Sequence, residues 1–353
     1  LPLAVSAAGA VLYYATENLR QNATHITKLS VYNPAQSLEL DAISQRNLEL
    51  VEPMFGTDKS GTLLHVLDRT VTPMGGRLLR SWILRPLYDR EAINRRLDAV
   101  EALKDDPLTL AELHETLGIV RDLERIIARL NLGNANARDL LALANSVSVL
   151  PGVKALLENF ATPLLEEVDQ AIPVLPELAE RIAAAIVEEP PLGFNDGGVF
   201  KTGYNAALDE FRQAATEGKN WLSSIQQREQ ERTTIKSLKV KYNQVFGYYI
   251  EISKANLNLV PDDYIRKQTL VNAERFITPE LKELESKILG AEDKAKALEY
   301  QLFQELREYV LGFTREIQTA AANLAILDVI CSLAECARDR RYQRPHILED
   351  NTL

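Results

Sequence analysis

Leu238-Lys239-Val240-Lys241-Tyr242-Asn243 and, shortly after it, Tyr248-Tyr249-Ile250-Glu251-Ile252-Ser253 alternate between apolar and polar side chains. A period of two is typical of a β-strand that buries one face. The strand-like sequence extends to Ile277, and the segments on either side of it have helical periods instead. The pattern therefore predicts a small β-rich part inserted into a mainly helical protein.

Two helical patterns flank this β-rich part. Each places apolar or small residues at alternating steps of three and four, which is the spacing of a left-handed coiled coil. The upstream positions are Tyr204, Leu208, Phe211, Ala215, Gly218, Leu222 and Ile225, and the downstream positions are Leu281, Leu284, Ile288, Ala291, Ala295, Leu298 and Leu302. We expect two long antiparallel helices with the sheet at their tip, the second being roughly 45 Å long at 1.5 Å per residue.

Charge is distributed unevenly along the chain. The 353 residues carry a net charge of −10, which argues against a wholly basic nucleic-acid-binding protein. Residues 236–282, however, contain eight Lys or Arg against five Asp or Glu, so this stretch is +3 and the remainder is −13. A local excess of cations suits contact with phosphates, although an ordinary solvated strand face would explain the charge equally well.

The rest of the chain is expected to form a helical bundle. Helical patterns cover residues 3–19, 62–67, 74–84, 89–103, 108–130, 138–158 and 163–187, whereas residues 37–50 alternate and predict two short strands. Thr278-Pro279-Glu280 is a helix start with a hydroxyl N-cap and Pro at the first position. The next proline is Pro345, so a long helix is expected, broken near Gly290 or Gly312. No uninterrupted apolar run reaches the ~18 residues of a membrane span.

Residues that support catalysis or metal binding are sparse. His25, His65, His114 and His346 are scattered, without the spacing of metal ligands. The Gly56–Gly61 spacing matches a phosphate-binding loop, but Thr62-Leu63 follows where Lys-Ser/Thr is needed, which favours a simple turn. Cys331 and Cys336 lie five residues apart on one helical pattern and are expected to be free thiols in a reducing cytosol. We therefore expect no active site, cofactor or metal within this chain.

The β-rich part does contain a candidate binding surface. Its cations, amides and a hydroxyl are the usual donors to the phosphate oxygens of DNA. Arg266 and Lys267 lead this set, although in a regular strand they would point to opposite faces, and Asp262 and Asp263 are expected to turn away from an anion. The tyrosines Tyr248 and Tyr249 are expected mainly to pack, one in the small core and one outside. The candidate DNA-binding residues are Asn243, Lys254, Arg266, Lys267, Gln268, Asn272 and Arg275.

Several motifs resemble the bacterial MutS family of DNA mismatch-recognition ATPases. In the β-rich part these are Leu238–Asn243, Phe246–Glu251, Asn272–Phe276 and Pro279–Lys282, which resemble the clamp of that family. Earlier in the chain, Leu48–Leu50, Gly61–Leu64, Thr72–Leu79 and Arg85–Leu87 resemble its core, or lever, domain. The resemblance covers essentially the whole chain.

The resemblance implies a domain organisation. Residues 1–35 would end a connector domain, residues 36–235 and 281–353 would form the two parts of the lever, and residues 236–280 would be the clamp. The chain begins at Leu1 without Met or a signal peptide, so it is expected to be a piece of a longer protein. The Phe-x-Glu mismatch-reading motif would precede Leu1, and the Walker A loop of the ATPase would follow Leu353.

The resemblance also implies a function. The clamp would bind double-stranded DNA through its backbone, in a cytoplasmic, nucleoid-associated homodimer that recruits a MutL-type partner. ATP and Mg would bind in the ATPase domain, and this piece would not itself be an enzyme or contact a membrane. Two alternatives remain open: a coiled-coil arm of another DNA-associated ATPase, of the cohesin or recombination-repair type, and a structural scaffold whose tip binds protein.

Overall fold

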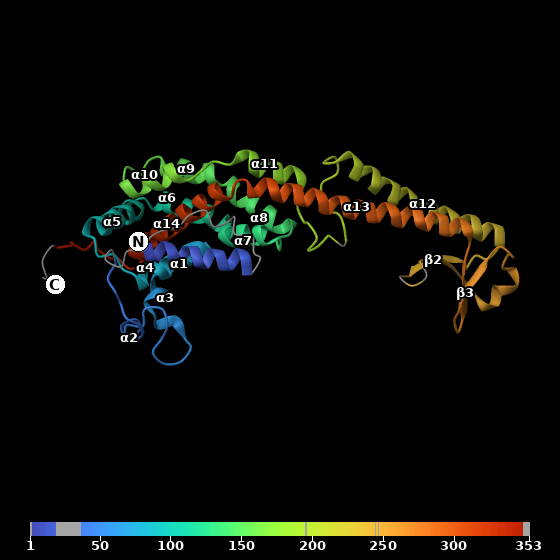
Figure 1. The fold of residues 1–353 in the computed structure, drawn as a ribbon, viewed down its shortest axis with the longest axis horizontal. Helices are drawn as coiled ribbons and strands as arrows, with labels where there is room; N and C mark the ends of the chain where they lie inside the picture. The colour runs from blue at the N-terminus through green and yellow to red at the C-terminus, as the bar shows by residue number, and fades with distance from the viewer. Residues whose placement is uncertain (1, 19–36, 195, 244, 246, 349–353) are drawn as a thin grey trace. The chain divides into compact units, whose positions relative to one another are not determined.

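The computed structural model describes residues 2–18, 37–194, 196–243, 245 and 247–348, and these are mainly helical with one small antiparallel sheet (Figure 1). A mainly α fold with a β-rich part is thus confirmed. The chain divides into two compact units: Leu1–Glu188 with Leu306–Leu353, here called the bundle unit, and Glu189–Glu305, the sheet unit. His25 and Leu19 lie outside the described residues, as do Gln244 and Phe246 of the expected hairpin.

The bundle unit is built mainly of helices joined by loops. Its helices are α1 (Pro2–Tyr13) with a π-helical turn (Tyr14–Asn18), α2 (Ala42–Asn47), a 3₁₀ turn (Lys59–Gly61), α3 (Leu63–Leu67), α4 (Pro73–Leu84), α5 (Arg90–Asp105), α6 (Pro107–Ile119), α7 (Leu123–Leu132), α8 (Ala137–Ser148), α9 (Leu150–Leu157), α10 (Pro163–Ala171), α11 (Pro176–Ala185) and α14 (Thr314–Asp339). The last turns of α13 (Pro279–Leu311) also belong to it.

Helix α14 is the central element of the bundle unit. It packs against α3, α4, α5, α6, α7 and α10, and its side chains from Leu324 to Cys331 are almost all buried. By length and composition alone, α14 and the α8–α9 segment (Ala137–Leu157) could cross a membrane, although neither is an uninterrupted apolar run. Because 67% of the apolar window of α14 is buried inside the unit, we interpret it as a core helix.

Three long helices expected from the sequence are each divided in two. The apolar stripe of residues 108–130 continues in register, but α6 ends at Ile119 and Asp122 caps α7 by accepting the N–H of Arg125. The other two breaks fall at prolines. Pro151 and Pro176 each lie in the first turn of a new helix, where a missing N–H costs nothing, rather than in a helix interior.

The two strands expected over residues 37–50 are wrong. Ser37 forms only an isolated bridge with Leu87, and Ala42–Asn47 is the helix α2. The carboxylate of Asp41 accepts the N–H of Ser44 at 2.6 Å, which begins this helix. A local N-cap thus overrides the weak alternation. Gly56–Gly61 is a turn that leads into a helix, as expected, with Thr62 capping α3.

The sheet unit contains α12 (Ala206–Thr233), most of α13 and the whole sheet. Its strands are β1 (Lys239–Asn243), β2 (Gly247–Ser253), β3 (Ile265–Thr269) and β4 (Ala273–Ile277), with a 3₁₀ segment η4 (Lys254–Leu259) between β2 and β3. The order is β1-β2-β4-β3 and every pair is antiparallel. Two hairpins therefore meet at β2 and β4. Helix α13 passes through Gly290 unbroken and ends before Gly312, so only the second of the two expected breaks exists.

The core of the sheet unit lies where both helices meet one face of the sheet. Leu238, Ile250 and Ile252 are fully buried there beside Leu281 and Ile288 of α13, as the alternation predicts. Contacts between α12 and α13 are close: a Cβ added to Gly218 would lie 2.3 Å from Cγ1 of Ile288. Ion pairs Arg228–Glu280 and Arg212–Glu299, at 2.5 and 2.6 Å, show that the two helices run antiparallel (Figure 1).

Candidate nucleic-acid interface

Arg275 lies in a polar cluster on the face of the sheet opposite its core. Register pairs Arg275 with Glu251 on β2 and with Gln268 on β3. Its Nη1 donates to Oε1 of Gln268 at 2.7 Å, and its guanidinium lies 4.4 Å from the ring centre of Tyr249. Only 19% of the Arg275 side chain is exposed. Its main role is therefore to order this face of the sheet, and little of its charge is accessible to a ligand.

Arg266 and Lys267 differ sharply in their surroundings. Nε of Arg266 lies 2.8 Å from Oε2 of Glu274, a carboxylate that is only 6% exposed, so this guanidinium compensates a buried charge. The pairing of β3 with β4 shifts between Arg266 and Gln268, which places a β-bulge at Lys267. A bulge leaves one residue outside the ladder and redirects its side chain. Strict alternation, and with it the expectation of opposite faces, therefore does not apply to this pair.

Lys254 and Asn272 lie together although the sequence separates them widely. The N–H of Lys254 donates to the carbonyl of Asn272 at 3.2 Å, which extends the β2–β4 pairing by one step, and both side chains are exposed. Within the described part of the chain, the ammonium groups of Lys254 and Lys267 have no ion-pair partner. These two lysines and Asn272 are the members of the candidate set that are most available to an anion.

The two remaining candidates have structural contacts. Oδ1 of Asn243 accepts the N–H of Val245 at 2.8 Å and so shapes the β1–β2 turn, and Gln268 is half-buried beside Arg275. The expectations for the acids Asp262 and Asp263 and for the tyrosines Tyr248 and Tyr249 are each met in part. Asp263 pairs with Arg232 on α12, and Tyr248 packs towards the core while Tyr249 is buried under Arg275.

Two further lysines extend the candidate surface. Lys236 and Lys239 are exposed, and neither has an ion-pair partner among the residues that the structure describes. Both contribute to the local charge of +3, but neither was in the candidate set, although Lys239 lies within the Leu238–Asn243 motif. Lys241, by contrast, pairs with Glu251 at 2.7 Å. Comparing charge with strand alternation would have identified Lys239 as an outward-facing cation.

The β1–β2 hairpin is attached to helix α13 through one carboxylate. Oε2 of Glu285 accepts the N–H of Tyr248 at 2.5 Å, and Oε1 lies 2.9 Å from Nζ of Lys282. Gly247 precedes this contact with φ +74°, and a Cβ there would lie 2.1 Å from the same carboxylate. The positive φ therefore favours glycine at this position, and a Cβ would displace the carboxylate that accepts the N–H of Tyr248.

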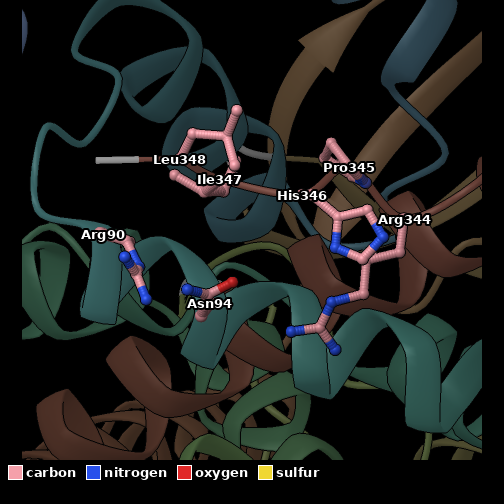
Figure 2. A pocket seen from close by; sticks show the side chains of 7 residues that line it. All are labelled: Arg90, Asn94, Arg344, Pro345, His346, Ile347 and Leu348. Carbon is pink, nitrogen blue, oxygen red and sulfur yellow. The ribbon is translucent and has the colours of Figure 1, made fainter. Parts of the chain in front are cut away.

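A polar cavity in the bundle unit is separate from the candidate surface. Figure 2 shows Arg90 and Asn94 of α5 facing the C-terminal segment across a space of about 720 Å³. Arg344 on its rim pairs with Asp98 at 2.6 Å and with Glu101 at 2.7 Å, so its charge is already compensated. Among the described residues, no group of three or more His, Cys, Asp or Glu side chains is placed to hold a metal ion.

Comparison with known families gives a match over most of the chain. The model of MutS domain III matches residues 44–334, which include the whole sheet and most helices of both units. The motifs that resembled MutS in the sequence all lie within the matched residues.

Individual relatives match across the full chain. "DNA mismatch repair protein MutS" of Alkaliphilus oremlandii is 47% identical over 351 residues, covering 99% of this chain and 40% of the relative. The protein of the same name from Halothermothrix orenii is 47% identical over 352 residues, and that from Pelotomaculum thermopropionicum is 48% identical over 351. The chain thus spans about two fifths of the length of these relatives.

Proposed function

Because the chain belongs to the MutS family and contains its domain III, we propose that it is the lever and clamp portion of a DNA mismatch-recognition protein. In this proposal the sheet of the sheet unit is the clamp, and it binds the backbone of double-stranded DNA without sequence preference. The observation that carries the proposal is a group of exposed lysines on and beside the sheet that have no ion-pair partner among the described residues: Lys236, Lys239, Lys254 and Lys267.

Phosphate contacts fit the needs of a protein that scans DNA. Contacts to phosphate oxygens position a protein without reading sequence, and they allow it to slide. In the proposed clamp, Lys254 and Lys267 supply the charge and Asn272 supplies an amide donor next to Lys254. The guanidinium groups of Arg266 and Arg275 instead stabilise the sheet through Glu274, Glu251 and Gln268.

The two long helices of the sheet unit support a mechanical role. We propose that α12 and α13 form an antiparallel coiled-coil arm, with 28 and 33 residues respectively. At 1.5 Å per residue the second helix is roughly 50 Å long, and paired helices transmit a displacement over such a distance better than loops do. The arm would couple clamp position to an ATPase domain that binds ATP and Mg, in a cytoplasmic homodimer with a MutL-type partner.

A salt titration of duplex binding by the complete protein tests the clamp assignment. Lys254→Gln and Lys267→Gln should each weaken binding equally for matched and mismatched duplexes. Each should also lower the slope of log affinity against log salt by roughly one, because one counterion-releasing contact is lost. Asn272→Ala should weaken binding and leave the slope unchanged, since an amide displaces no counterion.

Lys287→Gln serves as the matched control. This lysine is also exposed, but it lies on α13 and already pairs with Glu283 at 2.9 Å, so affinity and slope should stay those of the parent. Variants of Lys254 and Lys267 that bind like the parent, or that lose affinity only for the mismatched duplex, would refute backbone gripping by this surface.

One observation favours a second function, in which the tip binds a protein. Val245 and Val271, in the two hairpin turns, are 80% and 85% exposed. Exposed apolar side chains at a tip suit a protein partner. The two functions differ in salt dependence, because an apolar contact gives little slope against log salt. Binding that is insensitive to salt and lost in Val271→Ser would favour this alternative.

A further inference from the structure

A buried carboxylate at the end of α12 holds the residues that precede β3. Glu229 is only 6% exposed, and its Oε2 accepts the hydroxyl of Tyr264 at 2.8 Å. Nε of Arg232 donates to the same oxygen at 2.8 Å. A buried carboxylate is tolerated only when it is hydrogen-bonded and paired, and these two partners, together with Nε of Arg228 at 3.7 Å from Oε1, compensate Glu229.

Arg232 extends the network to a second residue of the same segment. Its Nη2 lies 3.0 and 3.2 Å from the two carboxylate oxygens of Asp263. Asp263 and Tyr264 are thus both tied to the last turns of α12. Burial, and next the hydrogen bond to Glu229, raise the pKa of the Tyr264 phenol, which keeps it a donor at all physiological pH values.

The ring of Tyr264 adds an apolar anchor to the polar one. It belongs to the core of the sheet unit and lies 5.9 Å from the ring centre of Phe276 on β4. Tyr264 is therefore fixed at both ends of its side chain. We call Glu229, Arg232, Asp263 and Tyr264 the latch.

Besides the latch, strand β3 is held by its pairing with β4, by the ion pair of Arg266 with Glu274 and by the hydrogen bond of Arg275 to Gln268. It is an edge strand that pairs only with β4, and its ladder is interrupted by the bulge at Lys267. It begins at Ile265, directly after Tyr264, so Lys267 lies three positions beyond the latch. Lys267, in the bulge, is the β3 residue that the ladder leaves out, so the place of its side chain depends on how the strand is anchored just before it.

We propose that Tyr264 and Glu229 are positioning residues that set the place of Lys267 on the DNA-facing surface. This inference rests on the proposed function, because it assigns to the latch the placement of a phosphate contact. The latch makes no contact with DNA itself. It acts by fixing the start of β3 to α12, so that the ammonium group of Lys267 is presented in one position instead of several.

Tyr264→Phe in the complete protein tests the latch, because it keeps the ring and removes only the hydroxyl. In the absence of DNA, the amides of residues 265–269 should exchange about tenfold faster, since a hydrogen bond to a buried carboxylate is lost. The amides of β1 and β2 should be unaffected. Tyr242→Phe, at an exposed tyrosine of the same sheet, is the control and should leave β3 unchanged. Unchanged exchange in Tyr264→Phe overturns the latch.

A double-mutant cycle with Lys267→Gln separates positioning from general loosening. Tyr264→Phe should weaken duplex binding about threefold in the parent and have no further effect when Lys267 is already Gln, because the latch acts through that lysine. Suppose that Lys267→Gln alone weakens duplex binding. The inference is then overturned if the losses of affinity add in the double variant, or if Tyr264→Phe alone causes no loss. If Lys267→Gln itself has no effect on affinity, the proposed function of this surface fails instead, and any change in exchange would still report the latch.

Discussion

The carboxylate of Asp328, in the middle of α14, accepts both the backbone N–H and the hydroxyl of Thr72, 256 residues earlier in the chain. The two distances to Oδ2 are 2.8 and 2.6 Å, and the N–H of Val71 adds a third bond to Oδ1 at 3.1 Å. The same hydroxyl of Thr72 caps α4 by accepting the N–H of Gly75 at 2.9 Å. The Thr72–Gly75 part of the family motif is thus a structural joint between α4 and α14.

Removing the hydroxyl of Thr72 should destabilise the bundle unit. Thr72→Val keeps the shape of the side chain but removes the cap of α4 and one bond to Asp328, so we expect a loss of about 2 kcal/mol. Urea unfolding followed by the fluorescence of Trp82, in a Trp221→Phe background, would measure it. Thr319→Val is the control: its hydroxyl bonds the carbonyl of Arg315 on an exposed face of α14, and a change under about 0.5 kcal/mol is expected. Equal effects of the two substitutions would contradict the joint.

The stability supplied by Asp328 should depend on pH. Burial raises the pKa of its carboxyl above the ordinary 3.8, and the bonds from Thr72 and Val71 only partly oppose this. The folded state therefore binds the proton more tightly than the unfolded chain does. Compared with Asp328→Asn, the wild-type protein should lose free energy of unfolding as the pH rises from 3.8 through the raised pKa that Asp328 has in the folded state.

The comparison needs one further background, because the charge of His114 also interacts with Asp328. Measuring wild type and Asp328→Asn with and without His114→Gln, from about pH 4 to 7, separates the two groups. The opposite result is that the free energy of unfolding of wild type minus that of Asp328→Asn stays flat or increases with pH. That result would mean that the three hydrogen bonds to the carboxylate outweigh its desolvation.

Two helical glycines should respond oppositely to alanine. At Gly218 on α12 the new Cβ would meet Ile288 at 2.3 Å, whereas at Gly290 on α13 nothing lies within 4 Å. Gly218→Ala should destabilise the sheet unit by about 1–3 kcal/mol through overpacking. Gly290→Ala should stabilise it by about 0.5–1 kcal/mol through helix propensity. Thermal unfolding monitored by Trp221, in a Trp82→Phe background, gives both values, and the same sign for both would refute the close approach of α12 and α13.

The end of α12 contains a strained residue. Thr234 follows the helix with φ +61°, in the left-handed region that β-branched side chains avoid. Thr234→Gly should therefore raise stability by about 1 kcal/mol. Thr234→Ala keeps a Cβ in the left-handed region, so it should recover less stability than glycine and serves as the comparison, with thermal unfolding as the measurement. A loss of stability in the glycine variant would show that the hydroxyl of Thr234, which bonds the carbonyl of Thr233 at 2.6 Å, matters more than the strain.

The sequence by itself determined the features that depend on local period. Leu238, Val240, Ile250 and Ile252 face the core as the alternation required, because successive side chains of a strand point to opposite faces whatever the surroundings. The apolar steps of α12 and α13 likewise marked residues that are buried, such as Leu222 and Leu284. The local pattern did not predict the helix breaks. Around Asp122 the apolar stripe stays in register from the end of α6 to the start of α7, so the period alone gives no sign of the break.

Only the tertiary structure decided which polar residues are available for binding. Arg266, Arg275 and Lys267 look alike in the sequence, but strand register gives the two arginines carboxylate or amide partners and leaves Lys267 in a bulge. The buried Glu299 likewise resembles its exposed neighbours until the N–H groups of Gly198 and Val199 and the guanidinium of Arg212 surround it. The reason is physical: a charge is compensated by groups within a few ångströms, and those groups come from segments whose distance in the sequence carries no information about their distance in space.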